Sequence, residues 1–400
     1  MSRPLRVVLV MVEPPCPFGN AAARGYYVLL KGLVDRGHRV TAFATSSVPE
    51  HAADALRRFP SPDHDLRVFP EPPPSRSFRQ RLRSIREPHS YLFSAELRRS
   101  LRAGLARGFD VLHLEQTWSG WVGREHANRA VLNVHYLFAI DRGDNPSGLP
   151  MDRLRGRLTL RAERALLRHF PTITTLSPRL ADRVREIHPD AVVQTVPLGI
   201  DASLYPFDPD PAPRSPTVAL IGSFGWGPTL GAGKRLLARL WPEIRRRVPE
   251  ARLRMVGRRA KVELGDLANI PGVEVFEDVP DTIPYFRSAD VLLYPTPLGS
   301  GMKVKVMEAF ALGTPVVTTW EGVEGLPARD GVEAGIADDD RGLIDRTVAL
   351  LGDRGRRVLQ RIEARRLIED HCGPGVTLDR VEAVYDRVVA KGSTAQRPVR

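Results

Sequence analysis

The residues best suited to chemistry gather between Ala289 and Leu326. An apolar run, Val291 to Tyr294, predicts a buried strand, and the loop Gly299-Ser300-Gly301 follows it. A short helix is then expected to open near Met302 and to stop at Gly313. The first N–H groups of a helix lack partners within the helix, and a glycine backbone lets an anion approach closely. This segment therefore predicts a phosphate-sized binding site.

Three charged side chains follow the glycine loop. Lys303 and Lys305 add positive charge at the expected helix start, and Glu308 follows Lys305 by three residues, on nearly the same helical face. The carboxylate of Glu308 is able to accept hydrogen bonds from two adjacent hydroxyls, such as those of a ribose. Phosphate-binding cations beside an acceptor for a diol predict a nucleotide diphosphate as ligand.

Lysine usage favours this binding site over an ordinary amphipathic helix. In the ordinary helix, Met302, Val306 and Phe310 face inward, while Lys305 and Glu308 form a solvated pair. The chain has 6 lysines and 53 arginines, yet two of the lysines lie two positions apart at this loop. A lysine ammonium is a compact, rotatable charge that suits a point contact to phosphate.

The segment resembles the donor-binding signature of glycosyltransferase family 4, retaining enzymes of the GT-B fold. The matching branch reads roughly G-S-G-x-(K/R)-x-K-x-x-E-A-x-A-x-G-x-P-V-V-x-T. The resemblance implies that Lys303 and Lys305 lie near the diphosphate and act in catalysis, that Ser300 and Gly301 belong to the donor site, and that Glu308 binds the ribose. Many members carry a second Glu where this chain has Ser300, so the sugar contact made by that Glu is in question here.

The loop from Glu13 to Asn20 is a second candidate segment. It separates the first expected strand from the first expected helix, and Asn20 is placed as the helix N-cap. The resemblance implies that this loop faces the diphosphate, with Gly19 in the donor site and Arg24 at a basic position on the acceptor side. A plain turn with a cap is the alternative.

The glycine-dense segment from Ile221 to Lys234 is the third candidate. It lacks the hydroxyl that a P-loop places after its lysine, because Arg235 follows Lys234. The resemblance implies instead that Gly222 and Ser223 bind the diphosphate, with Lys234 as the basic residue downstream.

Two expected strands of the first half carry histidine and glutamate. His135 follows the strand Ala130 to Val134, at the edge where ligands of α/β proteins gather. A lone histidine is usually a structural hydrogen-bonding group. The match of VLNVHY to the strand-and-histidine motif of the family implies that His135 contacts the donor sugar. His113 and Glu115 lie at the strand Val111 to Leu114 and are acceptor-side candidates.

The order of elements predicts an α/β fold with doubly wound parallel sheets. Strands are expected at 5–12, 39–44, 111–114, 130–134, 172–175, 192–196, 218–222, 252–256, 273–276, 291–294 and 315–318. Helices are expected at 21–35, 90–107, 151–168, 178–187, 234–247, 339–351, 354–369 and 376–390.

Five prolines between residues 205 and 216 predict a linker between two domains. We expect an acceptor-side Rossmann-like domain over 1–204 and a nucleotide-sugar-binding Rossmann-like domain over 217–375. A helix over 376–391 is expected to pack back on the first domain, and a tail over 392–400 to be disordered. Two such domains facing a central cleft form the GT-B arrangement that the resemblance implies.

The net charge of +12 and the pI of about 10.2 predict an anionic partner. Arginines concentrate between Arg76 and Arg107 and between Arg153 and Arg168, among apolar residues that include Phe78, Leu82, Tyr91 and Phe93. No zinc-finger, aromatic RNA-binding or basic-zipper pattern accompanies them, which argues against nucleic acid. Peripheral contact with an anionic membrane and ordinary solvated helix faces are the two remaining interpretations.

The composition predicts a cytoplasmic protein, with the inner face of the cell membrane as a peripheral location. The longest clean apolar run, Val7 to Val12, is too short to span a bilayer and lacks a signal-peptide cleavage pattern. Cys16 and Cys372 lie far apart and predict neither a disulfide framework nor a zinc site. Three Asp-x-Asp pairs, Asp63/Asp65, Asp208/Asp210 and Asp338/Asp340, are interpreted as structural, so we expect no metal and no cofactor.

The sequence thus predicts a metal-independent retaining glycosyltransferase that moves a sugar from a nucleotide diphosphate sugar to an acceptor hydroxyl. Polysaccharide, glycolipid or other glycoconjugate biosynthesis is the expected setting, with a lipid-linked molecule as one option for the acceptor. Two alternatives are a nucleotide-sugar epimerase of the same fold and a non-catalytic sugar- or membrane-binding protein in which Ser300 marks loss of the site.

Overall fold

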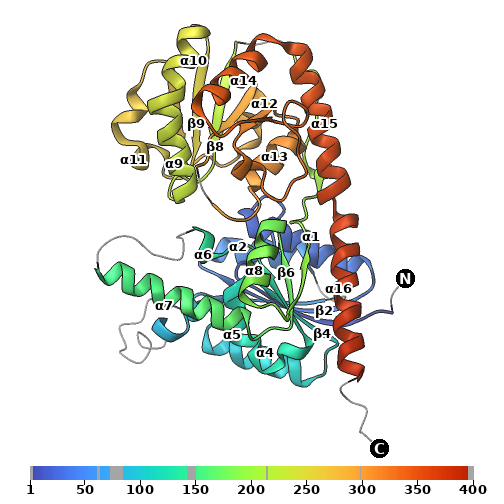
Figure 1. Ribbon diagram of the computed structural model, residues 1–400. Coiled ribbons are helices and arrows are strands. Elements are labelled where there is room, and N and C mark those ends of the chain that lie inside the picture. The colour runs from blue at the N-terminus through green and yellow to red at the C-terminus, as the bar shows by residue number, and fades with distance from the viewer. Residues whose placement is uncertain are drawn as a thin grey trace, which may run out of the picture. The chain divides into compact units, whose positions relative to one another are not determined.

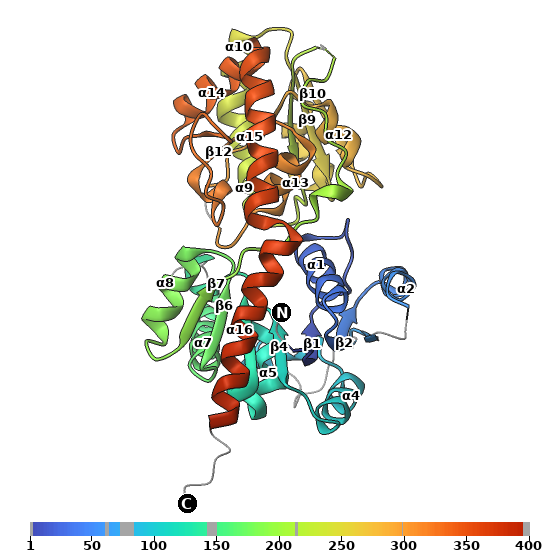
Figure 2. The same ribbon diagram turned by 90° about the vertical axis from the view of Figure 1, so that its right-hand side faces the viewer.

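The computed structural model describes residues 3–60, 64–72, 84–141, 150–212, 215–297 and 299–394. The chain divides into two compact units (Figures 1 and 2). Unit 1 comprises Met1–Ile200 and Pro374–Arg400, and unit 2 comprises Asp201–Gly373. The last helix of the chain therefore belongs to the first unit.

Unit 1 is built on a parallel sheet of seven strands in the order β3-β2-β1-β4-β5-β6-β7. From Val7 onward every residue of the first strand is buried, as expected for a parallel strand covered on both faces. The strands are β1 (Arg6–Met11), β2 (Arg39–Ser46), β3 (His64–Pro70), β4 (Val111–Glu115), β5 (Ala130–Val134), β6 (Thr172–Thr175) and β7 (Val192–Thr195).

Helices cover both faces of this sheet. The α-helices are α1 (Ala21–Asp35), α2 (Pro49–Arg58), α4 (Ala95–Ala106), α5 (Gly120–Gly123), α6 (Phe138–Asp141), α7 (Pro150–Leu167), α8 (Pro178–Ile187) and α16 (Pro374–Thr394). Short 3-10 turns are η1 (Ser90–Leu92), η2 (Thr117–Ser119) and η3 (Arg124–Arg129). On one face α1 and α16 pack against β1, β2, β4 and β5. On the other, Gly104 of α4 packs on Phe43 and Gly123 of α5 packs on Leu114.

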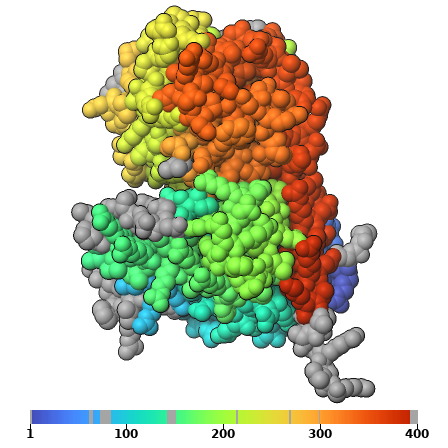
Figure 3. All heavy atoms as spheres, in the orientation of Figure 1, coloured from blue at the N-terminus to red at the C-terminus, as the bar shows by residue number. Residues whose placement is uncertain are grey.

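Helix α16 is held to unit 1 by apolar and ionic contacts. Leu378, Val381, Val384, Tyr385 and Val388 are buried in the same core as β1 and α1. Within the helix, Glu382 binds two residues that follow α1: the Nε2 of His38 lies 2.8 Å from Glu382 Oε1, and Arg36 Nη1 lies 2.6 Å from Glu382 Oε2. The outward side of α16, drawn in red in Figure 3, remains at the surface.

Unit 2 repeats the plan with a parallel sheet of six strands, ordered β10-β9-β8-β11-β12-β13. Its strands are β8 (Thr217–Ile221), β9 (Arg252–Gly257), β10 (Val273–Glu277), β11 (Val291–Tyr294), β12 (Val316–Thr318) and β13 (Gly335–Ile336). Its α-helices are α9 (Gly227–Arg235), α10 (Trp241–Arg247), α11 (Ala260–Leu264), α12 (Ile283–Ser288), α13 (Val304–Leu312), α14 (Asp340–Gly352) and α15 (Arg354–Cys372). Shorter turns are η4 (Ala202–Leu204), the π-helical η5 (Leu236–Leu240), η6 (Gly265–Asn269) and η7 (Trp320–Val323).

The expected doubly wound α/β fold is confirmed, and most expected strands lie within two residues of their observed bounds. Other expectations were wrong. The helix after β8 begins at Gly227 rather than at Lys234, and the prediction missed the elements α2, β3, α5, α6, α11, α12 and β13. Helix α13 begins at Val304, two residues after Met302, because Lys303 keeps extended backbone as its N-cap.

Several expectations concern residues outside the described ranges. Residues 395–400 of the expected tail, Asp63 of one Asp-x-Asp pair, and residues 76–83 of the first arginine-rich segment lie there. The expected linker forms neither helix nor strand over its described residues, 205–212 and 215–216. No helix in the described part of the chain is long and apolar enough to cross a membrane.

Candidate functional site

In each sheet the strand order reverses between two neighbouring strands, β1 and β4 in unit 1 and β8 and β11 in unit 2. The loops that leave such a pair turn to opposite faces of the sheet, and ligands of α/β proteins bind at the carboxyl ends of these strands. Sequence candidates of unit 1 follow β1, β4 and β5, and those of unit 2 follow β8 and β11. Each set is described within its own unit.

Lys305, which follows the glycine loop after β11, contacts the second candidate segment of unit 2, the glycine-dense residues after β8. Its Nζ donates to Thr229 Oγ1 in the first turn of α9 (2.5 Å) and lies 4.5 Å from the ring centroid of Tyr294, the last residue of β11. A Cβ on Gly222, which follows β8, would lie 2.5 Å from the same Nζ. Glycine at this position therefore makes room for the ammonium at the carboxyl ends of β8 and β11.

Lys303 has a different environment from Lys305. Its Nζ donates to the carbonyl oxygens of Gly299 (3.1 Å) and Gly301 (2.5 Å) and lies 3.8 Å from Glu324 Oε2. The side chains of Lys303 and Glu324 are 9% and 6% exposed. Lys303 thus braces the glycine loop around Ser300 from within the protein, and the positive charge of its ammonium is largely balanced by Glu324.

Glu308 lies on α13, whose residues are almost all buried, and is itself 8% exposed. A buried carboxylate is costly unless polar groups contact it. Glu308 is therefore a candidate for a polar role among the mainly apolar residues of α13. Lys305 and Glu308 lie one turn apart on α13, as the spacing predicted. Ser223, directly after Gly222, is exposed at the end of β8.

Lys234 is not brought to this group. It lies exposed in the last turn of α9, seven residues after the first helical residue, Gly227. At 1.5 Å of rise per residue this is about 10 Å along the helix axis. Thr229, in the first turn, instead makes the contact with Lys305. The expected helix start at Lys234 was wrong, because α9 begins at Gly227. The donor-binding role of Lys234, which rested on the family resemblance, stays a prediction.

In unit 1 the carboxylate of Glu115 joins two histidines. Its Oε2 lies 2.6 Å from His135 Nε2 and accepts from Asn133 Nδ2 (3.0 Å), and its Oε1 lies 3.0 Å from His113 Nε2. The contact with His113 has the distance of an ion pair but is poorly aligned for a hydrogen bond. Burial alone would raise the pKa of Glu115, but the two histidines outweigh burial and hold this pKa well below its usual range.

This network changes the interpretation of the acceptor-side candidates. His113 and Glu115 are only 2% and 3% exposed. Glu115 contacts His135, which is 9% exposed at the end of β5, so the pair supports that histidine, and their acceptor-side role stays a prediction. The spacing of His113 and Glu115 placed both at the carboxyl end of β4 but could not show that they face inward.

The loop before α1 is braced by its own side chains. Asn20 caps the helix as expected, because its Oδ1 accepts from Ala23 N. Arg24, 9% exposed, donates from Nε to the carbonyl oxygen of Gly19 (2.7 Å) and from Nη2 to that of Phe18 (3.4 Å). Arg24 therefore shapes the loop that carries Gly19.

The sequence analysis missed two acidic residues of this region, Glu13 and Glu163. Glu13 follows β1 at the strand reversal, where any carboxylate is a candidate, and this position was the available signal. Burial raises its pKa to about 7, although Asn20 and His135 oppose the shift. Glu163 of α7 accepts the N–H groups of Phe138 (2.8 Å) and Ala139 (3.1 Å) and so fixes the turn after His135.

Comparison with known families agrees with this geometry. Residues 215–353 match the family described as Glycosyl transferases group 1, and residues 21–199 match the Glycosyl transferase 4-like domain. Together the two matches cover most of the chain. The chain belongs to the group 1 glycosyltransferases. No curated protein sequence matches this glycosyltransferase.

Solved structures of low sequence identity share the fold of this glycosyltransferase. Sucrose-phosphate synthase from Thermosynechococcus elongatus is 17% identical, with a TM-score of 0.73 over 96% of this chain and 99% of that one. HepE from Anabaena, in complex with UDP and glucose, is 13% identical, with a TM-score of 0.67 over 95% and 99%. WaaG, a glycosyltransferase involved in lipopolysaccharide biosynthesis, is 15% identical, with a TM-score of 0.63 over 94% and 99%. The fold is GT-B, as expected.

The Asp-x-Asp residues of the glycosyltransferase that are described have structural partners. Asp65 pairs with Arg67 (2.6 Å), Asp210 with Arg354 (2.8 Å) and Asp340 with Arg235 (2.8 Å). Over the described ranges, no group of three or more His, Cys, Asp or Glu side chains has an arrangement suited to a metal ion.

The raised pKa of Glu13 predicts a pH-dependent stability. The folded glycosyltransferase holds this proton up to about pH 7, whereas the unfolded chain releases it near pH 4.5. The stabilising contribution is therefore complete below pH 4.5 and is lost as the pH rises to about 7. Relative to wild type, Glu13→Gln should gain about 1 to 3 kcal/mol in unfolding free energy between pH 4.5 and 7.5.

Urea unfolding of both proteins across this pH range measures the difference. Glu163, whose pKa burial also raises to about 7, is present in both proteins and cancels. A difference that stays constant with pH would contradict the proposal that Glu13 holds its proton in the folded protein.

Proposed function

We propose that this group 1 glycosyltransferase moves a sugar from a nucleotide diphosphate sugar to an acceptor hydroxyl, with retention of anomeric configuration, in glycoconjugate biosynthesis. The observation that carries the proposal is the Lys305 ammonium beside Gly222, at the carboxyl ends of β8 and β11. A lysine beside a glycine at this edge suits a diphosphate. The similar HepE structure contains UDP and glucose, which supports a nucleotide sugar as the donor.

In the proposed reaction, negative charge grows on the leaving diphosphate as the anomeric bond breaks. Lys305 and the N–H groups of the loop between Gly299 and Gly301 stabilise that charge more strongly than they stabilise the bound substrate. Because Lys303 braces the loop, these donors are already in place before the reaction. Glu308 accepts hydrogen bonds from the ribose hydroxyls.

Retention in this proposal needs no protein nucleophile. The acceptor attacks the face from which the diphosphate leaves, and the leaving phosphate takes the proton of the acceptor hydroxyl. His135 is proposed to contact the donor sugar, as the family resemblance implies. Cationic side chains and N–H groups meet the phosphate charge, so the proposed reaction uses neither a metal ion nor a cofactor.

Lys305→Ala and Glu308→Gln test the donor site. Each variant loses a charge-assisted hydrogen bond to the donor, so kcat/KM should fall by about 10- to 100-fold, the equivalent of roughly 1.5 to 3 kcal/mol. The measurement is a thermal-shift panel of nucleotide diphosphates and their sugars, followed by transfer kinetics with the nucleotide sugar that stabilises the wild type most.

Lys261→Ala on α11 is the matched control, because Lys261 is an exposed lysine of the same unit. It should keep wild-type kinetics. Near-normal transfer by both donor-site variants would contradict the assignment. Release of an altered sugar nucleotide without any acceptor would favour an epimerase instead.

Metal independence has its own test. Transfer measured in excess EDTA should proceed at the rate seen in untreated enzyme, because Lys305 and backbone N–H groups replace the divalent ion. Loss of activity that manganese or magnesium restores would count against the proposed mechanism.

We also propose that unit 1 contacts an anionic membrane at the inner face of the cell membrane, where a lipid-linked acceptor would be reached. Exposed Arg99 and Arg102 lie on α4, and the start of α7 exposes Met151 (73%) and Leu154 (53%). The residues in and beside η1 interact with both α4 and α7. Arg98 of α4 donates to the Ser90 and Phe93 carbonyls. Burial lowers the pKa of His89, and the positive charge of Arg155 of α7 lowers it further.

The apolar residues first expected to enter the headgroup layer need correction. Phe93 is 3% exposed and belongs to the core, and Phe78 and Leu82 lie outside the described residues. Tyr91 remains exposed at 46%. Met151 and Leu154 take the place of Phe93 in the proposal.

Arg99→Glu/Arg102→Glu and Met151→Ser/Leu154→Ser test this surface by liposome co-sedimentation. Basic residues near an anionic surface contribute about 1 kcal/mol each at low salt, so the arginine variant should bind about tenfold more weakly or worse. Arg341→Glu/Arg366→Glu, in unit 2, changes the net charge equally and should leave binding intact. Equal recovery of wild type with neutral and anionic vesicles would make this region an ordinary solvated surface.

A further inference from the structure

A tyrosine of the last helix reaches the histidine network of unit 1. Tyr385 of α16 is fully buried, and its hydroxyl lies 2.6 Å from His113 Nδ1. The two rings meet edge to face at 81°, with centroids 5.7 Å apart. His113 Nε2 in turn lies 3.0 Å from Glu115 Oε1, and Glu115 Oε2 lies 2.6 Å from His135 Nε2. A continuous chain of polar contacts therefore leads from α16 to His135.

The Tyr385 hydroxyl is placed to set the protonation pattern of His113. Burial, together with the charges of Glu115 and Glu382, raises the pKa of Tyr385 well above its usual value, so the hydroxyl keeps its proton. If this hydroxyl donates to Nδ1, that nitrogen is an acceptor. His113 is then a neutral ring with its proton on Nε2, which faces Glu115.

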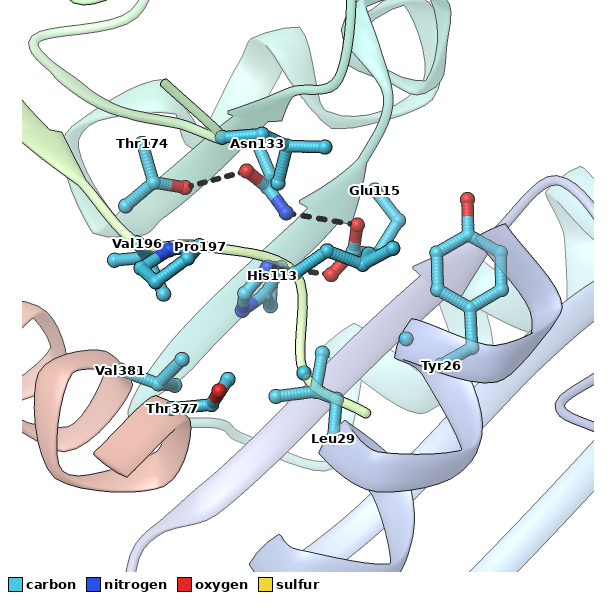
Figure 4. Close-up of a pocket in the computed structure, with 14 residues that line it drawn as sticks. Tyr26, Leu29, His113, Glu115, Asn133, Thr174, Val196, Pro197, Thr377 and Val381 are labelled. Atoms are coloured by element: carbon cyan, nitrogen blue, oxygen red, sulfur yellow. Dashed lines mark hydrogen bonds and ion pairs between the residues drawn. The ribbon is translucent and has the colours of Figure 1, made fainter. Parts of the chain in front are cut away.

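The other side of Glu115 is equally well defined. Thr174 Oγ1 donates to Asn133 Oδ1 (3.0 Å), which turns the Asn133 amide nitrogen toward Glu115. Figure 4 shows Thr174, Asn133, Glu115 and His113 in sequence along the edge of a small cavity of about 30 Å³, with Thr377 of α16 on its wall. Glu115 thus accepts from a neutral amide, and when the Tyr385 hydroxyl donates to Nδ1 it faces a neutral imidazole, so neither group balances its negative charge.

We propose that Tyr385 donates its hydroxyl proton to His113 Nδ1 and is thereby a positioning residue that, through His113 and Glu115, makes His135 the histidine that carries the compensating positive charge. A buried carboxylate needs a cation beside it, and His135 Nε2, at 2.6 Å, is the remaining titratable contact of Glu115. His135 then holds protons on both nitrogens. Its Nδ1 proton is a charged donor for a ligand oxygen at the end of β5.

Other titratable groups face this network from each neighbouring element. Glu13 follows β1, Tyr26 of α1 lies with its ring centroid 5.9 Å from that of His135, and Glu382 of α16 is paired with Arg36 and His38. The kinetic part of this inference rests on the proposed function, in which His135 contacts the donor sugar.

Nitrogen-15 NMR of histidine-labelled, full-length protein tests the proposal without any assay of activity. Single histidine-to-asparagine variants assign the imidazole signals. In wild type we expect His113 as a neutral ring protonated on Nε2 and His135 as a doubly protonated ring. A doubly protonated His113 or a neutral His135 in wild type overturns the proposal, whether or not any Tyr385 variant folds.

Tyr385→Phe removes only the hydroxyl and keeps the packing of the ring. His113 should lose its single tautomer, the doubly protonated fraction of His135 should fall, and kcat should drop about tenfold with KM for the nucleotide sugar nearly unchanged. Thr377→Val is the control on the same helix, because its buried hydroxyl has no hydrogen-bond partner among the described residues. It should leave both readouts unchanged.

The outcomes separate this inference from the proposed function. Unchanged His135 signals in Tyr385→Phe overturn the link through His113, and changed signals with unchanged kcat overturn the positioning role. If Lys305→Ala and Glu308→Gln transfer sugar normally, the proposed donor site fails while the NMR result for the histidines still stands.

Discussion

Every strand of both sheets runs in the same direction, and this constraint decides where chemistry takes place. Parallel strands must be returned by crossover helices, so all their carboxyl ends share one edge. The strand order reverses between β1 and β4 and between β8 and β11. There the segments that follow the two neighbouring strands turn toward opposite faces of the sheet. Glu13, Glu115 and His135 are placed at this edge of one sheet, and Gly222 and Lys305 at that of the other.

The two edges handle buried charge in different ways. In unit 2, Lys303 lies against loop carbonyls and Glu324, which leaves Lys305 as the cation near Gly222. In unit 1 a single carboxylate, Glu115, organises donors from two strands. Burial makes each of these arrangements sensitive to the loss of one partner, because an unpaired charge in a low-dielectric interior is costly. Such networks hold donors rigidly before a ligand arrives, which is the property that electrostatic catalysis requires.

Periodicity was sufficient to predict the fold, because long apolar strands and amphipathic helices carry a strong local signal. Local signals were insufficient where tertiary contacts decide. The sequence could not show that Lys303 turns inward while Lys305 reaches Gly222. Both lysines follow the glycine loop, two positions apart, so the sequence alone does not distinguish their roles. Nor could it show that Glu115 is buried rather than presented to a ligand, because both environments suit the end of a strand. Family resemblance located the segments, and only packing could assign roles within them.

The position of α16 has a consequence for how the protein is made. The core of unit 1 includes Leu378, Val384 and Val388, although the rest of that unit lies before residue 201. Synthesis on the ribosome proceeds from the N-terminus, and domains fold as their segments emerge. Unit 2, from Asp201 to Gly373, is therefore complete before unit 1 is. During this interval the nascent chain exposes the apolar face that α16 later covers, which makes this stage of biosynthesis the one most in need of a chaperone.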